Sequence, residues 1–204
     1  VKTLFEAAFH HVWNNEMEDD GFNKLVLGAG REWREIVMLR GYCKYLLQAA
    51  IPYSQSYLED TLANQVNITE MLVELFECRF DPEKASNAEK HVKKLEEKLA
   101  GALDNVVSLE EDKILRRYLN IIKSTLRTNF YQLAEDGTPK PYVSFKIDSG
   151  NVDDLPLPRP AIEVFVHSPR VDAVHLRGGS VARGGIRWSD RKEDFRTEIL
   201  GLMK

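Results

Sequence analysis

The spacing of apolar residues changes abruptly near residue 127, and this change limits the folds that the chain can adopt. Before it, apolar residues recur at intervals of three and four, which is the repeat of an amphipathic helix. After it, short segments alternate between apolar and polar residues, which is the repeat of a half-buried strand. We therefore predict an α+β fold, with a helical domain at 1–126 followed by a small β-rich domain at 127–204.

Several segments of the predicted helical domain carry the pattern of individual helices. Residues 1–17 and 31–50 have wide apolar faces. Residues 83–103 are rich in lysine and glutamate, which is typical of a solvated helix face with ion pairs three and four residues apart. Ser108, with a glutamate three residues later, predicts the start of another helix, whose apolar face extends to Leu126.

The second domain begins with short segments that favour strands. The aromatic stretch at 128–133 is followed by turn residues and by the alternating stretch at 142–148, and the two can form a hairpin. Prolines in 153–160 leave no room for a helix there. Further strands and a final helix complete the prediction, at 161–167, from Val171 onward and at 195–204.

Two Gly-Gly pairs, Gly178-Gly179 and Gly184-Gly185, occur among arginines near the end of the chain. Glycine lets backbone amides approach a ligand closely, and guanidinium groups match the geometry of a carboxylate or phosphate. This combination predicts an anion site. The alternative is a hairpin turn at the first pair and a β-bulge at the second, with solvated arginines. The spacing by itself leaves both interpretations open.

Composition narrows the classes of partner. The 204 residues are 43% hydrophobic, which is enough for a buried core, and carry a net charge of -4 at pH 7. An acidic total argues against a generic nucleic-acid binder. Between Arg170 and Lys192, however, six basic residues occur with two acidic ones, so this segment can still attract a small anion.

The cysteines and the lack of a long apolar run indicate the compartment. Cys43 and Cys78 lie in apolar, helical segments without the paired spacing of a metal site, so we predict buried free thiols in a reduced, cytoplasmic environment. No segment approaches the roughly 20 apolar residues of a spanning helix, and no membrane partner is predicted. The chain stops at Lys204 within a helix-like pattern, so we expect an internal piece of a longer protein.

The segment ARGGIRWSDR, followed by EDFRTEILGLMK, resembles the substrate-domain signature of glutamate dehydrogenases, and most closely the large NAD-specific class of bacteria. In this family a Lys-Gly-Gly-apolar-Arg segment opens the amino-acid site, and a helix follows it. Here Arg183 stands in the place of the lysine, as is expected of the large class. The remaining positions are filled in order by Gly184, Gly185, Ile186 and Arg187.

The resemblance implies the fold and the activity of the parent protein. The predicted helical domain at 1–126, here called the helical block, would lead into the α/β substrate domain of a glutamate dehydrogenase. A separate domain outside this chain would bind NAD. The enzyme would oxidise L-glutamate to 2-oxoglutarate and ammonium, through an imino acid formed when hydride leaves the α-carbon. It is also expected to be a homo-oligomer.

The resemblance further implies which residues touch the substrate. The candidates are Arg183, Gly184, Gly185, Arg187 and Ser189. Arg183 is the leading choice to bind a substrate carboxylate, with the glycines allowing close approach. Arg187 either joins the pocket or braces the loop through an ion pair with Asp190 or Glu193. Ser189 either donates a hydrogen bond to the substrate or caps the next turn.

Other parts of the family's machinery have no counterpart in the chain. Its catalytic lysine, in a Gly-X-Lys-Gly-Gly segment, and its catalytic aspartate are absent, and Lys204 lies close to the position of its second substrate lysine. Gly28 and Gly30 lack the strand-to-helix context of a dinucleotide-binding turn. Trp188 is expected to be a packing anchor. We therefore predict no catalytic, cofactor or metal site in this chain, and no turnover by it alone.

Two alternatives come from other functional classes. The helical block can be a regulatory or assembly module of a larger enzyme, docking neighbouring subunits through a charged face that includes Lys93, Lys94 and Lys98. The glycine- and arginine-rich segment can instead be a phosphate or RNA site. The acidic total and the lack of an aromatic stacking platform near the arginines make this second alternative the weaker one.

Overall fold

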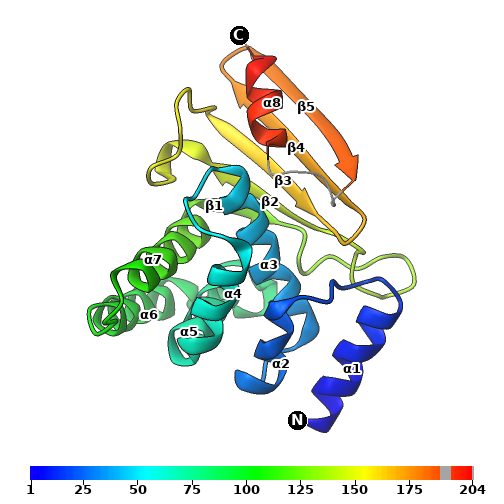
Figure 1. The fold of residues 1–204 in the computed structure, drawn as a ribbon, viewed down its shortest axis with the longest axis vertical. Helices are drawn as coiled ribbons and strands as arrows, with labels where there is room; N and C mark the ends of the chain where they lie inside the picture. Colours follow the sequence, from blue (N-terminus) through cyan, green and yellow to red (C-terminus); the bar gives the residue numbers. More distant parts are fainter. Residues whose placement is uncertain (189–193, 204) are drawn as a thin grey trace.

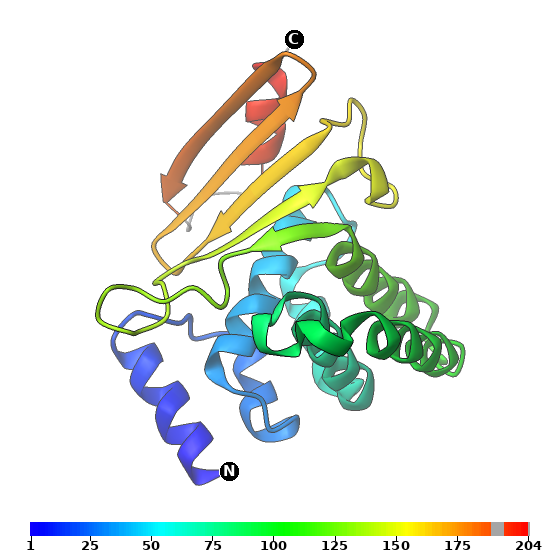
Figure 2. The same cartoon turned by 180° about the vertical axis from the view of Figure 1, so that it is seen from behind.

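The computed structural model describes residues 1–188 and 194–203, which form an α+β fold, as predicted (Figures 1 and 2). The α-helices are α1 (Lys2–Trp13), α2 (Lys24–Gly28), α3 (Trp33–Gln48), α4 (Gln55–Asn64), α5 (Val66–Phe80), α6 (Ala88–Leu103), α7 (Leu109–Ser124) and α8 (Phe195–Gly201). The strands are β1 (Thr125–Thr128), β2 (Val143–Asp148), β3 (Ile162–His167), β4 (Val171–Gly178) and β5 (Val181–Trp188). Short 3-10 helices occur at Gly21–Asn23, Pro82–Asn87 and Ser149–Asn151.

The sheet is a meander, in which each strand pairs antiparallel with the next one along the chain. Val143, Phe145 and Ile147 alternate with polar residues on β2 and point to its buried face. Helices α3, α7 and α8 contact the sheet from one side, as Figure 1 shows. In the reverse view no helix among the described residues covers the outer face (Figure 2).

Helix α3 approaches β2 closely because a glycine faces the sheet. A Cβ atom at Gly41 would lie 2.9 Å from the ring of Phe145 and 3.2 Å from a methyl group of Val143. The ring of Tyr42 stacks on Phe145 with centroids 4.1 Å apart. Glycine inside a helix costs roughly 0.5–1 kcal/mol relative to alanine. The close contact between helix and sheet offsets that loss, and the two layers share one hydrophobic core.

The change from helix to strand comes slightly earlier than the predicted boundary at 126 and 127. Helix α7 ends at Ser124 and β1 begins at Thr125. The hydroxyl of Tyr42 in α3 lies 3.0 Å from that of Thr125, so the first strand residue is already held by the helical block. That the two parts of the chain are separate domains stays a prediction.

The predicted hairpin forms, but the predicted position of its first strand, 128–133, is wrong. Strand β1 covers Thr125–Thr128 and pairs antiparallel with β2. The next residue, Asn129, ends the strand with its side chain: Nδ2 donates to the carbonyl of Tyr142 (3.2 Å), and Oδ1 accepts from the amide of Ser144 (2.7 Å). A side-chain amide therefore takes the place of a further backbone rung.

The apolar stripe of α1 is only partly buried. Ala8 packs into the core, whereas Phe5, Phe9 and Trp13 are 52%, 58% and 76% exposed. Their rings stack along the helix, with centroids 6.4 Å apart for the first pair and 6.1 Å for the second. The spacing of the stripe predicted the helix correctly but not which of its apolar residues would be covered.

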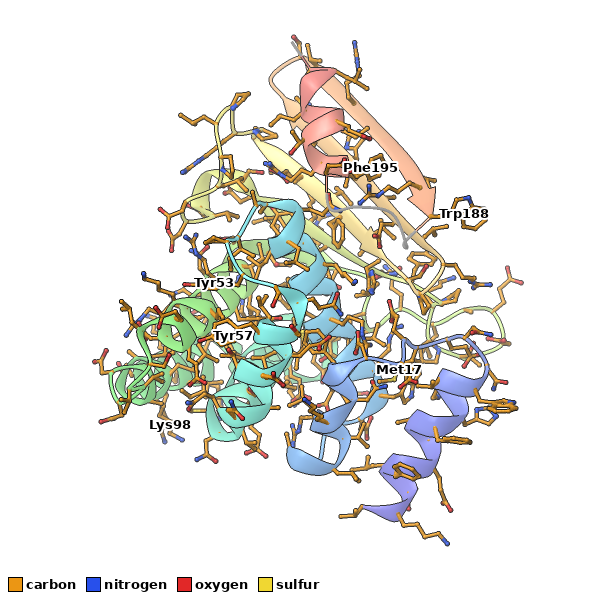
Figure 3. All side chains as sticks on the ribbon, viewed as in Figure 1. Met17, Tyr53, Tyr57, Lys98, Trp188 and Phe195 are labelled. Atoms are coloured by element: carbon orange, nitrogen blue, oxygen red, sulfur yellow. The ribbon has the colours of Figure 1, made fainter. Side chains whose placement is uncertain are left out.

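Two other features of the helical block are as predicted. Cys43 and Cys78 are buried and free, and burial raises the pKa of Cys43 to about 12, which leaves its thiol protonated. Lys93, Lys94 and Lys98 are exposed on α6, and Figure 3 shows Lys98 pointing outward. No helix within the described ranges is both long and apolar enough to cross a bilayer.

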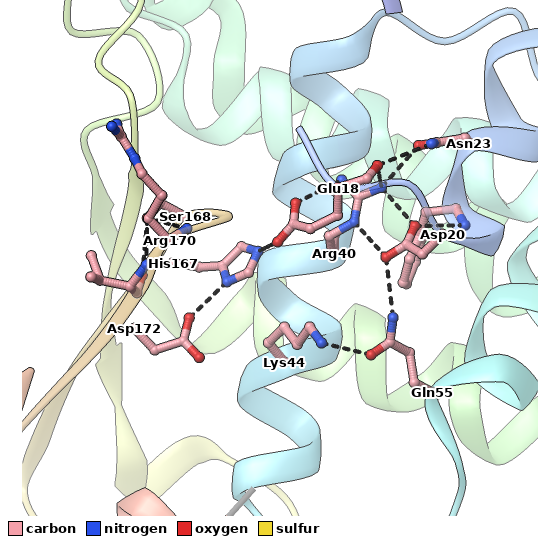
Figure 4. A network of polar contacts seen from close by, with 12 residues as sticks. Glu18, Asp20, Asn23, Arg40, Lys44, Gln55, His167, Ser168, Arg170 and Asp172 are labelled. Atoms are coloured by element: carbon pink, nitrogen blue, oxygen red, sulfur yellow. Dashed lines mark hydrogen bonds and ion pairs between the residues drawn. The ribbon is translucent and has the colours of Figure 1, made fainter. Parts of the chain in front are cut away.

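A buried ionic cluster joins the helical block to the sheet (Figure 4). His167, at the end of β3, is fully buried between two carboxylates. Its Nδ1 lies 2.9 Å from Asp172 of β4, and its Nε2 lies 2.9 Å from Glu18, which precedes α2. Glu18 also faces Arg40 of α3 at 3.5 Å, and Arg40 pairs with Asp20 at 2.7 Å.

The pKa values of this cluster follow from burial and charge together. Burial lowers the pKa of His167, but its contacts with Asp172 and Glu18 outweigh burial, so the pKa rises above the ordinary 6.5. Burial raises the pKa of Glu18, yet the contact with His167 and the charge of Arg40 outweigh it and bring that pKa down to about 2. The charged forms of both groups are therefore favoured in the folded state.

We expect the free energy of unfolding to decrease as the pH rises above about 6.5, because the unfolded chain then releases the proton of His167 while the folded protein, in which the pKa is raised, still holds it. His167→Gln should remove most of this slope. Urea denaturation between pH 6 and 8 measures it, and His175→Gln, at an exposed position on β4, is the matched control. An unchanged slope in His167→Gln would show that another group titrates.

Candidate functional site

Strand β5, at an edge of the sheet, carries four of the five predicted substrate-binding residues. It pairs with β4 in an unbroken antiparallel register. Arg183 lies opposite Leu176, and Arg187 lies opposite Asp172. Both β4 partners are buried, so the two arginine side chains start from the face of the sheet that α8 covers.

The predicted residues do not all share one face. Gly184 lies opposite the exposed His175 on the outer face, where a shallow hollow of about 340 Å³ opens over it. Gly185 faces α8 on the other side. A ligand at the edge of β5 can contact groups from both faces, because successive residues of a strand alternate. Ser189 and Lys204 lie outside the described residues.

The two Gly-Gly pairs have different backbone roles. Gly178 ends β4 and pairs with Val181, and Gly179 begins the turn between β4 and β5 with a φ of 58°, which favours glycine. The hairpin-turn interpretation is therefore correct for this pair. The bulge interpretation is wrong for Gly184 and Gly185, because both pair with β4 without a shift in register.

The missing side chains of Gly184 and Gly185 provide space for neighbouring atoms. A Cβ atom at Gly184 would lie 2.9 Å from the carbonyl oxygen of Val174 on β4. A Cβ atom at Gly185 would lie 3.1 Å from the ring of Phe195 and 3.3 Å from Ile199, both on α8. The glycines thus permit tight strand and helix packing. That a ligand also approaches them stays a prediction.

Arg183 is exposed and has no acidic partner among the described residues. Its Nη1 donates a hydrogen bond of 2.9 Å to the carbonyl of the preceding residue, Ala182. The rest of the guanidinium group carries a full charge toward solvent at the edge of the sheet. This arrangement suits a side chain that binds an incoming carboxylate, because no internal ion pair has to be broken first.

Arg187 is held much more tightly. Its side chain is 8% exposed, Nη1 lies 3.2 Å from Asp194, and the guanidinium carbon is 4.8 Å from the ring centre of Phe195. Nε and Nη2 are buried and have no hydrogen-bond partner in the described part of the chain. The carboxylates predicted to pair with it, Asp190 and Glu193, lie outside the described residues. Through Asp194, Arg187 braces the start of α8.

A buried ion pair that the sequence reasoning missed holds α8 in place. Arg196 and Glu163 of β3 are 2% and 1% exposed, and two hydrogen bonds of 2.8 and 2.6 Å join them. Glu163 also accepts from the hydroxyls of Tyr45 and Ser149 at 3.1 and 3.0 Å. The signal was present, since alternation along β3 places Glu163 on the buried face beside Phe165.

The expectation that Trp188 is a packing anchor is wrong. Its side chain is 69% exposed, and Figure 3 shows it projecting from the end of β5. Trp188 lies opposite Val171 and shares the uncovered outer face with Ile186, which is 74% exposed. Phe195, labelled in the same figure, packs against the strand from the covered side instead.

Comparison with known families decides what this strand and helix belong to. Residues 98–204 match the family described as bacterial NAD-glutamate dehydrogenase, catalytic domain. The chain belongs to the bacterial NAD-glutamate dehydrogenases. Residues 17–82 match a second model, described as glutamate dehydrogenase, helical motif 3, so helices α2 to α5 as well as the sheet lie within matched regions. The predicted family is confirmed.

Curated relatives agree with this assignment along nearly the whole chain. The NAD-specific glutamate dehydrogenase of Halomonas elongata is 52% identical over 200 residues, 98% of this chain. Those of Pseudomonas aeruginosa and Mycobacterium tuberculosis are 49% and 45% identical, over 100% and 98% of the chain. The aligned segments make up only 12%, 13% and 12% of these three relatives, so the chain spans a small part of their length.

Gly184→Ala should lower the free energy of unfolding by about 1–3 kcal/mol, the usual range for overpacking, because the new methyl group meets a backbone carbonyl. Gly101→Ala in α6 is the control. No atom lies within 4 Å of its added methyl group, and alanine is favoured in a helix by roughly 0.5–1 kcal/mol. Urea denaturation at pH 7 compares them. Equal stability of Gly184→Ala and the original protein would contradict the packing role.

Proposed function

We propose that this chain supplies one wall of the substrate pocket in an NAD-dependent glutamate dehydrogenase. The parent enzyme converts L-glutamate to 2-oxoglutarate and ammonium, with hydride passing to NAD. The match of 98–204 to the catalytic domain supports the reaction class, and the exposed guanidinium of Arg183 at the edge of β5 supports the place of the pocket.

The chemistry of the substrate explains why a cation is needed there. L-glutamate and 2-oxoglutarate each carry two carboxylates, and hydride transfer requires the α-carbon to be held in a fixed position. A guanidinium binds a carboxylate through two parallel hydrogen bonds, which sets both position and orientation. We assign this task to Arg183, because Arg187 is already engaged by Asp194.

The other candidates have supporting tasks in this proposal. Gly184 and Gly185 let the substrate lie against the backbone of β5, and Ser189 donates a hydrogen bond to it. Arg187 keeps α8 in register with β5 through its ion pair and its contact with Phe195. The arginine thus acts on the pocket by positioning the strand and the helix.

The cofactor and the setting are proposed as follows. NAD binds to a domain outside this chain. The substrates are L-glutamate and 2-oxoglutarate, with no nucleic-acid or membrane partner. The enzyme acts in the cytoplasm, a location that the two buried, unpaired cysteines support. Catalytic acid and base groups also come from outside the chain.

In the full-length enzyme, Arg183→Ala should reduce kcat/KM for glutamate by about 10- to 100-fold, because a hydrogen bond to a charged group contributes roughly 1.5–3 kcal/mol. Arg183→Lys, which keeps the charge but cannot form two parallel hydrogen bonds, should lose less activity than Arg183→Ala. NADH absorbance measures both. The same assay should detect no NADH formation by the 204-residue chain alone. Unchanged kcat/KM in Arg183→Ala would remove this residue from the pocket.

A second candidate function is assembly, and the exposed aromatic face of α1 favours it. We propose that the full-length enzyme is a homo-oligomer and that Phe5, Phe9 and Trp13 contribute to contacts between its copies, since large exposed apolar patches mark interaction surfaces. Light scattering should show a multiple of the monomer mass that Phe9→Ser reduces. Arg127→Gln, at an exposed position on β1, is the control. A mass that Phe9→Ser leaves unchanged would contradict this role for α1.

A further inference from the structure

A second cleft, larger than the hollow over Gly184, lies beside the turn between β3 and β4. It has a volume of about 860 Å³ and is lined by the end of α1, the start of α3, the loop between β1 and β2, and the turn between β3 and β4. None of the four described residues that were predicted to bind the substrate lines it. Its volume falls in the range of small-molecule sites, roughly 300–1,000 Å³.

The wall of this cleft contains a buried cation without a counter-charge. Arg34 is 8% exposed, and its Nη1 and Nη2 donate to the carbonyls of Lys140 and Tyr142 at 2.9 and 3.4 Å. Within the described ranges no carboxylate pairs with it, and its buried Nε has no hydrogen-bond partner. Burial alone lowers its pKa to about 10, and the guanidinium stays charged at pH 7.

The other buried arginines, unlike Arg34, each pair with a carboxylate. Arg40 pairs with Asp20 at 2.7 Å, and Arg196 pairs with Glu163 at 2.6 Å. Burial of an unpaired ion costs several kcal/mol, which is why buried charges are normally paired. Arg34 is therefore the exception among them, and it lines the cleft.

The rest of the lining adds positive charge. Lys140 and Arg170 line the cleft together with Arg34. These three cations outnumber the two carboxylates there, Glu16, which lies 2.6 Å from His11, and Asp136, which accepts hydrogen bonds from the amide and hydroxyl of Thr138 at 2.9 and 2.7 Å. An anion entering the cleft thus meets a net positive field.

One wall of the cleft is aromatic. The rings of His11 and Trp33 stack with centroids 3.7 Å apart, and Tyr142 lies on the same lining. The guanidinium carbon of Arg34 lies 5.8 Å from the ring centre of Trp33. Flat apolar groups pack well on such surfaces, while the neighbouring guanidinium attracts a negative group.

We propose that this cleft binds a small organic anion, in which a carboxylate or phosphate group neutralises Arg34 and a flat apolar body lies against His11 and Trp33. The site is separate from the strand assigned to glutamate. Because its walls come from α1, α3 and two loops of the sheet, a bound anion also ties the helical block to the sheet.

The proposal can be tested with benzoate and its neutral analogue benzamide, titrated into the 15N-labelled 204-residue chain at constant ionic strength. Benzoate should shift the amide signals of His11, Trp33 and Tyr142 and bind at least tenfold more tightly than benzamide. Inorganic phosphate, titrated alone, shows which anionic group is accepted. Shifts from phosphate at the same signals extend the class to phosphates, and shifts from benzoate alone confine it to carboxylates; both support an anion site.

Variants locate the charge that the ligand needs. Arg34→Met should weaken benzoate about tenfold or more, and Arg170→Gln, at an exposed position on the rim, should weaken it severalfold without disturbing the fold. Arg127→Gln, an exposed cation on β1 outside the cleft, is the control and should bind as before. Equal binding of benzoate and benzamide, shifts confined to β5, or full affinity in Arg170→Gln would each overturn the proposal.

Discussion

The charged residues on the buried face of β3 govern how the sheet lies on the helices. Glu163 and His167 share that face with Phe165, and both are almost completely shielded from water. A buried charge is tolerated only beside a counter-charge with good geometry. Glu163 meets Arg196 of α8, and His167 meets Glu18 of the helical block. These two pairs together fix the sheet along α3 and set the position of α8.

These ion pairs position α8 and, through it, the strand that carries the proposed substrate pocket. Arg196 anchors α8 to β3, which lies two strands away from β5 in the sheet. The same helix presents Phe195 to Gly185 and Asp194 to Arg187. Strand β5 is thereby held along one edge by its pairing with β4 and on its covered face by α8. Arg183, free of such contacts, keeps its charge available at the edge.

The sequence predicted local structure better than long-range contacts. Alternation located β2, β3 and β4, and the turn at Gly179 follows from glycine's tolerance of positive φ. Periodicity could not tell that Asn129 would end β1 with its own side chain, because that choice depends on the facing strand. Periodicity also could not show which apolar residues of α1 would be buried and which would stay exposed. The motif made Arg183 a candidate, whereas Arg34 gave no local signal, since its lack of a counter-charge arises only from tertiary packing.

The meander gives the molecule two very different kinds of connection. Every strand is bonded to its neighbour in the chain, and the turns from β3 to β4 and from β4 to β5 are short, so the entropy lost in closing them is small. The amide of Arg196, by contrast, donates to the side chain of Gln48 across 148 residues. Closing so long a segment of chain costs more entropy, and the buried hydrogen bonds and charges where α8 meets α3 and β3 hold the ends of that segment together.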